Sequence, residues 1–145
     1  MRYPLVRKKS AQAVSPLRLI KWCAEWREKE EYEKVPLNLR GIYVLYKRER
    51  ETDCYNVMYV GMAASGTGIK RRLRSHARSK RKRDKWSHFS FFAVWENIRN
   101  DEISELESLF REIYRKDDRA NSLNKQKGSK TISLVRRKRA SEWER

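Results

Sequence analysis

The chain has 145 residues, with 36 Lys and Arg against 19 Asp and Glu, so its formal net charge is +17. This length fits a single domain with a core of its own. No apolar run approaches the roughly 20 residues that a membrane-spanning helix needs, and the first residues lack the pattern of a secretory signal peptide. These properties exclude a transmembrane protein and predict a cytoplasmic, intracellular one.

Cysteine and aromatic content narrow the class further. Cys23 and Cys54 are too few for a disulfide framework and form no C-x-x-C pair, which argues against a zinc ribbon or a redox site. The five Trp, seven Tyr and four Phe supply the apolar area that an ordered core requires. Such an excess of positive charge repels itself unless a polyanion offsets it, so we expect a folded domain that binds nucleic acid. Solubility alone is the other explanation of the charge.

The first part of the chain predicts a basic arm over residues 1–10 and then a helix. Ser15 is a candidate N-cap with Pro16 at the first helical position, and Val35-Pro36 ends the helix. The apolar residues between them recur at spacings of three and four: Leu19, Ile20, Cys23 and Trp26.

A β-hairpin is expected next. Residues 41–47 (GIYVLYK) and 57–61 (VMYVG) are rich in β-branched and aromatic residues, and a polar turn separates them. Gly61 marks the end of the second strand or a close approach of the backbone to another group. Beyond it, Ile69, Leu73 and Ala77 predict a short helix with one apolar face.

Cations fill almost all the other positions of this short helix and the segment after it. Between residues 70 and 83 there is no acidic residue, and the cations are Lys70, Arg71, Arg72, Arg74, Arg78, Lys80, Arg81, Lys82 and Arg83. We interpret them as contacts to nucleic-acid phosphates. His88 is either a further contact near the substrate or a polar surface residue.

The last elements are a strand and helices. Residues 89–95 (FSFFAVW) predict a buried strand, and a helix capped by Asn100 or Asp101 follows. Its predicted apolar stripe is Ile103, Leu106, Leu109, Phe110 and Ile113. The basic tail lies loosely on the surface or forms a short last helix. This order predicts an α/β or α+β fold, in which helices flank a small, largely antiparallel three-stranded sheet.

Two tripeptides bracket the predicted hairpin, Gly41-Ile42-Tyr43 and Tyr59-Val60-Gly61, and the basic helix follows them. In this order they resemble the GIY-YIG nuclease superfamily over roughly residues 38–126. That division leaves 1–37 as a basic arm with a helix and 127–145 as a basic tail. The resemblance implies the fold of that family and the activity of a hydrolase, an endonuclease that cuts DNA phosphodiester bonds with the help of a divalent metal.

The resemblance also implies site residues. Arg72, in the segment Arg72-Leu73-Arg74-Ser75-His76, matches the family's helix motif and would be the catalytic Arg, with His76 on the same helix face. Glu107 matches the family's Glu. Asn124 matches its Asn, with Asn121 as the alternative.

These matches imply a different catalytic role for each residue. Glu107 would hold Mg²⁺, or Mn²⁺ in its place, because such cations take oxygen ligands and keep several waters. Arg72 would neutralise the scissile phosphate through its planar fork of donors. Either Tyr43 or Tyr59 would be the general base, and His76 would donate a hydrogen bond, relay a proton or orient the water.

Structural roles are the alternatives at each position. Glu107 would then only pair with Arg111 four residues along its helix, and the tyrosines would only pack. As partner we expect DNA, duplex or branched, in preference to RNA, with no membrane; the sequence leaves a homodimer open. The alternative function is a non-catalytic basic nucleic-acid-binding module with the same fold.

Overall fold

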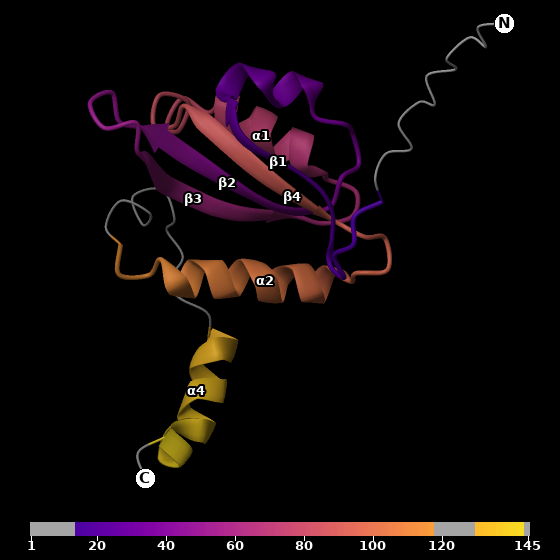
Figure 1. The fold of residues 1–145 in the computed structure, drawn as a ribbon, viewed down its shortest axis with the longest axis vertical. Helices are drawn as coiled ribbons and strands as arrows, with labels where there is room; N and C mark the ends of the chain where they lie inside the picture. Colours follow the sequence, from indigo (N-terminus) through magenta and orange to yellow (C-terminus); the bar gives the residue numbers. More distant parts are fainter. Residues whose placement is uncertain (1–13, 118–129, 144–145) are drawn as a thin grey trace, which may run out of the picture.

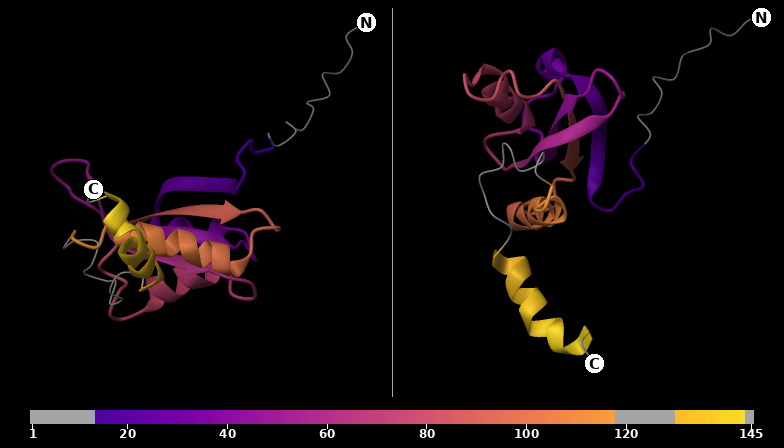
Figure 2. Two further views of the ribbon diagram at one scale, coloured as in Figure 1. Left: turned by 90° about the horizontal axis from the view of Figure 1, so that it is seen from below. Right: turned by 90° about the vertical axis from the view of Figure 1, so that its left-hand side faces the viewer.

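The computed structural model describes residues 14–117 and 130–143. Four strands form one antiparallel sheet in the spatial order β1-β4-β2-β3: β1 (Ile20–Glu28), β2 (Gly41–Arg48), β3 (Tyr55–Ala63) and β4 (His88–Val94). The helices of the described chain are the 3-10 helix η1 (Lys29–Lys34) and the α-helices α1 (Ile69–Arg78), α2 (Asn100–Ile113) and α4 (Lys130–Trp143). α1 and η1 lie on one face of the sheet and α2 on the other (Figures 1 and 2).

The α+β class and the antiparallel sheet are thus as predicted, but the expected three strands are wrong, because the sheet has four. The additional strand is β1, in the region for which a helix was predicted. The predicted hairpin is confirmed as β2 and β3, the strand over 89–95 as β4, and the short helix as α1. The tail contains a helix, α4, and α2 has Arg99 as its N-cap, one residue before the expected position.

β1 is a strand because the free edge of β4 needs a partner. Its residues pair with β4 from Ile20, opposite Val94, to Glu28, opposite His88. The Ser15 hydroxyl does not cap a helix; it donates to the carbonyl of Ile20, five residues along the chain. Local hydrogen bonding of this kind by serine competes with helix formation, which explains why the capping signal was misleading.

A β-bulge in β1 hides the alternation that would have indicated a strand. The pairing register shifts between Ala24 and Arg27, and Trp26 within the bulge has a φ of 57°. The Trp26 ring therefore packs on Tyr46 and Tyr55, with centroids 4.6 and 5.1 Å away. Since an extra residue reverses the order of faces, the apolar residues of β1 do not follow a period of two.

The central strand β2 separates two apolar layers. Its alternate side chains Tyr43 and Leu45 join the cluster beneath α1, whereas Ile42, Val44 and Tyr46 join the cluster against α2. A strand buried on both faces reads as a continuous apolar run, as residues 41–46 do.

The predicted apolar stripe of α2 is only partly correct. Ile103 is fully buried, and Leu106 and Tyr114 pack on the sheet. Leu109, however, is 48% exposed and Ile113 63% exposed, because the sheet-facing line of the helix runs through other positions, including Glu107. Among the described residues, no helix is both long and apolar enough to cross a membrane.

Candidate active site

The register of the hairpin brings the two motif tyrosines together. Tyr43 on β2 lies opposite Gly61 on β3, and Tyr59 lies two residues before Gly61, so it projects from the same face. The two tyrosine rings stack with centroids 5.9 Å apart. A Cβ added to Gly61 would lie 2.5 Å from the Tyr43 hydroxyl and 2.6 Å from Cε1 of Tyr59. Glycine is therefore what allows both rings to reach this place.

α1 brings His76 to these tyrosines. Ile69 and Leu73 anchor the helix in the core, and His76 follows on the same buried face. The Tyr43 hydroxyl lies 2.8 Å from Nε2 of His76, and the Tyr59 ring lies 4.8 Å from the imidazole between centroids. The indole Nε1 of Trp86 donates to the main-chain carbonyl of His76 at 3.4 Å, which ties the helix to the start of β4.

Burial keeps His76 neutral. Loss of solvent, together with the positive charges of Lys82 and Arg72, lowers its pKa to about 4. Lys82 also lies over the Tyr59 ring, with Nζ 5.0 Å from the centroid. The sequence had assigned Lys82 to phosphate contacts only, and nothing in its local pattern indicated that it borders the tyrosines.

Tyr43 is held as a neutral hydroxyl. Burial raises its pKa well above the ordinary value, Tyr59 raises it further, and Glu107 adds to the rise while Arg72 opposes it. At neutral pH the group therefore keeps its proton until a neighbouring base accepts it.

Glu107 is on α2, and its charge acts on Tyr43 and is itself acted on by Arg72. It is 8% exposed, and burial raises the pKa of its carboxyl against the opposing charges of Arg111 and Arg72. Its Oε1 lies 2.6 Å from Nη2 of Arg111, so the ion pair expected as the structural alternative is present. This ion pair is nevertheless unlike an ordinary surface pair, because the Glu107 carboxylate is buried and loses much of its solvation free energy.

The positive charge of Arg72 acts on all three of the buried titratable residues described above. Arg72 is exposed on α1, and its guanidinium lowers the pKa of each of the three buried residues, Tyr43, His76 and Glu107. Together with Tyr59 these residues form what we call the tyrosine site: Tyr43, Tyr59, Arg72, His76 and Glu107. A shared positive charge beside buried proton donors and acceptors is suited to an anionic substrate.

Not all predicted site residues join this group. His88 lies opposite Tyr46 at the other end of β2 and contacts the hydroxyl of Ser87 through Nδ1 at 2.8 Å. Asn121 and Asn124 lie outside the described residues. The predicted phosphate-binding cations are found on α1 and in the segment that joins it to β4.

The donor set bears on which metal the tyrosine site could hold. Within residues 14–117 and 130–143, no three His, Cys, Asp or Glu side chains form a group able to hold a metal ion. Glu107 is the carboxylate of the tyrosine site. Such a set fits a hard cation that keeps most of its waters, and it does not fit a zinc site enclosed by protein ligands.

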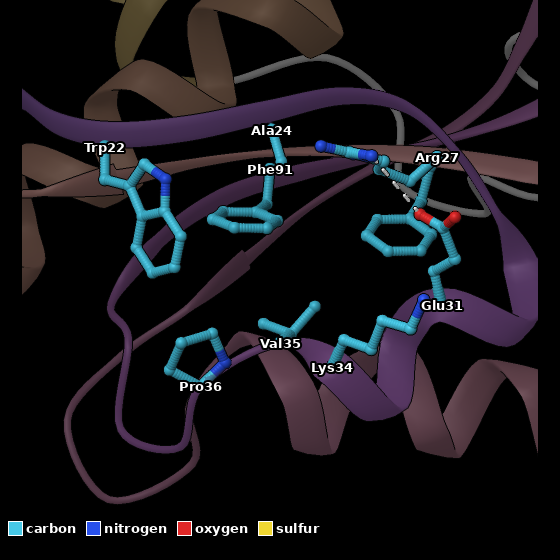
Figure 3. A pocket seen from close by; sticks show the side chains of 9 residues that line it. Trp22, Ala24, Arg27, Glu31, Lys34, Val35, Pro36 and Phe91 are labelled. Carbon is cyan, nitrogen blue, oxygen red and sulfur yellow. Dashed lines mark ion pairs between the residues drawn. The ribbon is translucent and has the colours of Figure 1, made fainter.

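A separate hollow of about 190 Å³ lies between β1 and η1 (Figure 3). Phe91 and Val35 line it, Trp22 meets Phe91 edge to face at 5.6 Å, and Arg27 pairs with Glu31 at 3.7 Å on its rim. None of the predicted catalytic residues that the structure describes lines this hollow. It is therefore not part of the tyrosine site.

No family model, curated protein or solved structure matches this chain.

Proposed function

We propose that the chain is a divalent-metal-dependent DNA endonuclease of the GIY-YIG type, and that the tyrosine site hydrolyses the phosphodiester bond. The observation that carries the proposal is the contact between the Tyr43 hydroxyl and His76 Nε2 at 2.8 Å, with the charges of the buried Glu107 and the exposed Arg72 both acting on Tyr43. Hydrolysis requires a base for water and a cation for the phosphoryl oxygens, and these residues supply both.

The tyrosine–histidine contact supports a proton relay. The attacking water gives a proton to the Tyr43 hydroxyl oxygen while Tyr43 passes its own proton to the unprotonated Nε2 of His76. A pKa of about 4 makes His76 a weak base in the empty site, but the negative charge of a bound phosphodiester raises that pKa. The substrate thus strengthens the base that its own hydrolysis requires. This assigns the base to Tyr43, which has the direct contact, in preference to Tyr59.

Arg72 and Glu107 complete the chemistry. Arg72 presents planar, paired donors to the phosphoryl oxygens as negative charge gathers on them. Glu107 would hold Mg²⁺ or Mn²⁺, which when bound neutralises charge on the phosphoryl and leaving oxygens. As the hydroxide adds to phosphorus the P–O bond to the leaving oxygen breaks, and this oxygen takes a proton from solvent.

Cleavage of supercoiled plasmid in Mg²⁺ and in EDTA tests the proposal with matched variants. Glu107→Gln keeps the size of the side chain but loses its charge, and Glu105→Gln makes the same change at an exposed position of α2. Arg72→Lys removes the planar fork, and Arg74→Lys is its control on α1. We expect Glu107→Gln and Arg72→Lys to lower the rate by about 100-fold or more, with DNA affinity retained at a temperature where each variant is folded, and the controls to cut normally.

Three results would contradict the proposal. Cleavage in EDTA, or a normal rate in Glu107→Gln, would remove the metal-dependent mechanism. The wild type could instead bind plasmid and branched DNA in a salt-sensitive way without cutting either. This result would favour a non-catalytic binding module, which the basic surface of α1 also supports.

A further inference from the structure

A second cationic hollow lies at the opposite end of β2 from the motif tyrosines. It has a volume of about 360 Å³ and is lined by Lys47, Arg48, Arg50, Ser87 and His88. We call it the hairpin-end pocket. The sequence interpretation treated residues beyond 47 as a polar turn, although the run Lys47-Arg48-Glu49-Arg50 at a strand end was a visible sign of concentrated charge.

Hydrogen bonds from the framework fix the wall of this pocket. The amide of Arg48 donates to the Ser87 hydroxyl at 2.9 Å, the same hydroxyl meets His88 Nδ1, and the amide of Ser87 donates to the carbonyl of Tyr46 at 2.7 Å. The Tyr55 ring packs edge to face on His88, with centroids 5.0 Å apart. These contacts between the β4 side and the hairpin therefore fix the positions of the lining residues without a ligand.

Donors dominate the pocket, although Asp53 pairs with one of its lining cations and Glu28 lies opposite His88 in the sheet. None of the lining residues is acidic. Glu49 accepts from Thr52 and Asn56, and the exposed Asp53 pairs with Arg48. The Arg50 side chain and the Lys47 ammonium, which donates to the Asp84 carbonyl at 3.2 Å, contribute positive charge at the rim. A hollow with cations, a hydroxyl and an imidazole fits a phosphate group.

The pocket is connected to the tyrosine site by the segment that follows α1. Lys82 of this segment lies over Tyr59, and two residues later the Asp84 carbonyl accepts from Lys47. The segment that carries Lys82 thus also contacts Lys47 of the pocket. The five steps from Tyr43 to Arg48 span about 17 Å of strand, which equals the rise of about five nucleotides along the axis of a DNA duplex.

We propose that the hairpin-end pocket binds a backbone phosphate of the DNA substrate about five nucleotides from the bond that is cut, and so sets the direction in which the DNA crosses the enzyme. This inference rests on the proposed function for the position of the cut. Phosphate recognition in the pocket itself does not require that the protein cleave DNA.

Binding of a fluorescein-labelled DNA duplex, followed by anisotropy between about 50 and 200 mM NaCl, tests the pocket. The variant is Lys47→Gln with Arg50→Gln, both exposed. The matched control is Lys34→Gln with Arg18→Gln, which removes the same charges from exposed positions outside the pocket. We expect the slope of log affinity against log salt to become shallower by about 1 in the pocket variant and to stay unchanged in the control. Equal changes in both would overturn the proposal.

Replacement of single phosphates by neutral methylphosphonates locates the contact. The substrate is a duplex with one preferred cleavage site, mapped first with the wild type. We expect wild-type binding to weaken with a methylphosphonate at the cut and at a second position about five nucleotides away. The pocket variant should be insensitive to the second substitution only. A wild type without a second sensitive position, or a pocket variant that keeps it, would contradict the inference.

The two proposals fail differently. If the pocket variant changes the salt slope but no protein cuts DNA, the endonuclease proposal fails and the phosphate pocket stands. If the wild type cuts in Mg²⁺, Glu107→Gln does not, and the pocket variant behaves like its control, the pocket proposal fails alone. Melting curves of each variant show that the change is in binding and not in folding.

Discussion

At the scale of single residues, the buried imidazole of His76 makes stability depend on pH. Its pKa is about 4 in the fold against 6.5 ordinarily, because burial disfavours the charged form. Below pH 6.5 the unfolded chain therefore takes up a proton that the folded chain refuses until about pH 4. The stabilisation is fully present above pH 6.5 and is lost as the pH falls through this window, by about 3 kcal/mol in total.

Urea unfolding of the wild type and of His76→Gln, at pH 7 and at pH 4, measures this effect. Glutamine keeps a polar side chain beside Tyr43 but does not titrate, whereas the carboxylates of the two proteins titrate alike. We expect the wild type to lose about 3 kcal/mol more than the variant between the two pH values. Equal losses would mean that His76 carries its ordinary pKa in the fold.

The residues of the tyrosine site illustrate what a sequence pattern can and cannot predict. Gly61 was expected to mark a strand end or a close approach, and the two tyrosine rings beside it are that approach. Helix spacing placed His76 on the face of Arg72, beside Ile69 and Leu73; the structure buries His76 with Ile69 and Leu73, whereas Arg72 is exposed. No local pattern could place Lys82 over Tyr59, because that contact depends on how the chain turns after α1.

At the scale of elements, β1 provides the sharpest test of the fold. Cys23 pairs with Phe92 across β1 and β4, so their side chains share a face of the sheet. In a Cys54→Ser background, Phe92→Cys should form a disulfide with Cys23 on mild oxidation, visible as faster migration in non-reducing electrophoresis. Phe91→Cys projects from the other face and should not cross-link, because one residue along a strand reverses the side.

If residues 20–28 formed a helix, Cys23 would not lie opposite Phe92, and cross-linking would not distinguish position 92 from position 91. The helical spacing of Leu19, Ile20, Cys23 and Trp26 was a real feature of the sequence, but it did not decide the structure. Pairing with β4 is a contact between segments 60–74 residues apart, and it outweighs local preference. α1 was predictable because its apolar residues follow the helical period, and β2, β3 and β4 because they are rich in β-branched and aromatic residues; the bulge at Trp26 removes the alternation that would have marked β1.

At the scale of the whole molecule, charge repulsion should lower the stability of the unliganded protein. The net charge is +17, and the cations of α1 and the following segment lie close together. Exposed ion pairs such as Lys21 with Glu96 contribute little, because solvent screens them, so they do not offset this crowding. Nucleic acid would remove the repulsion and stabilise the fold by mass action.

Added salt tests this balance without a ligand. Raising NaCl from about 10 to 150 mM shortens the screening length from about 30 to 8 Å, which weakens repulsion between neighbouring cations. We expect the melting temperature to rise by about 4 °C for each kcal/mol of repulsion removed. Lys80→Glu with Arg81→Glu, at two exposed positions, should melt higher at low salt and respond less to NaCl. A wild-type melting temperature that stays level or falls with salt would mean that attractive ion pairs outweigh the repulsion. The excess positive charge would then not destabilise the unliganded fold, and a polyanion would not stabilise it by removing repulsion.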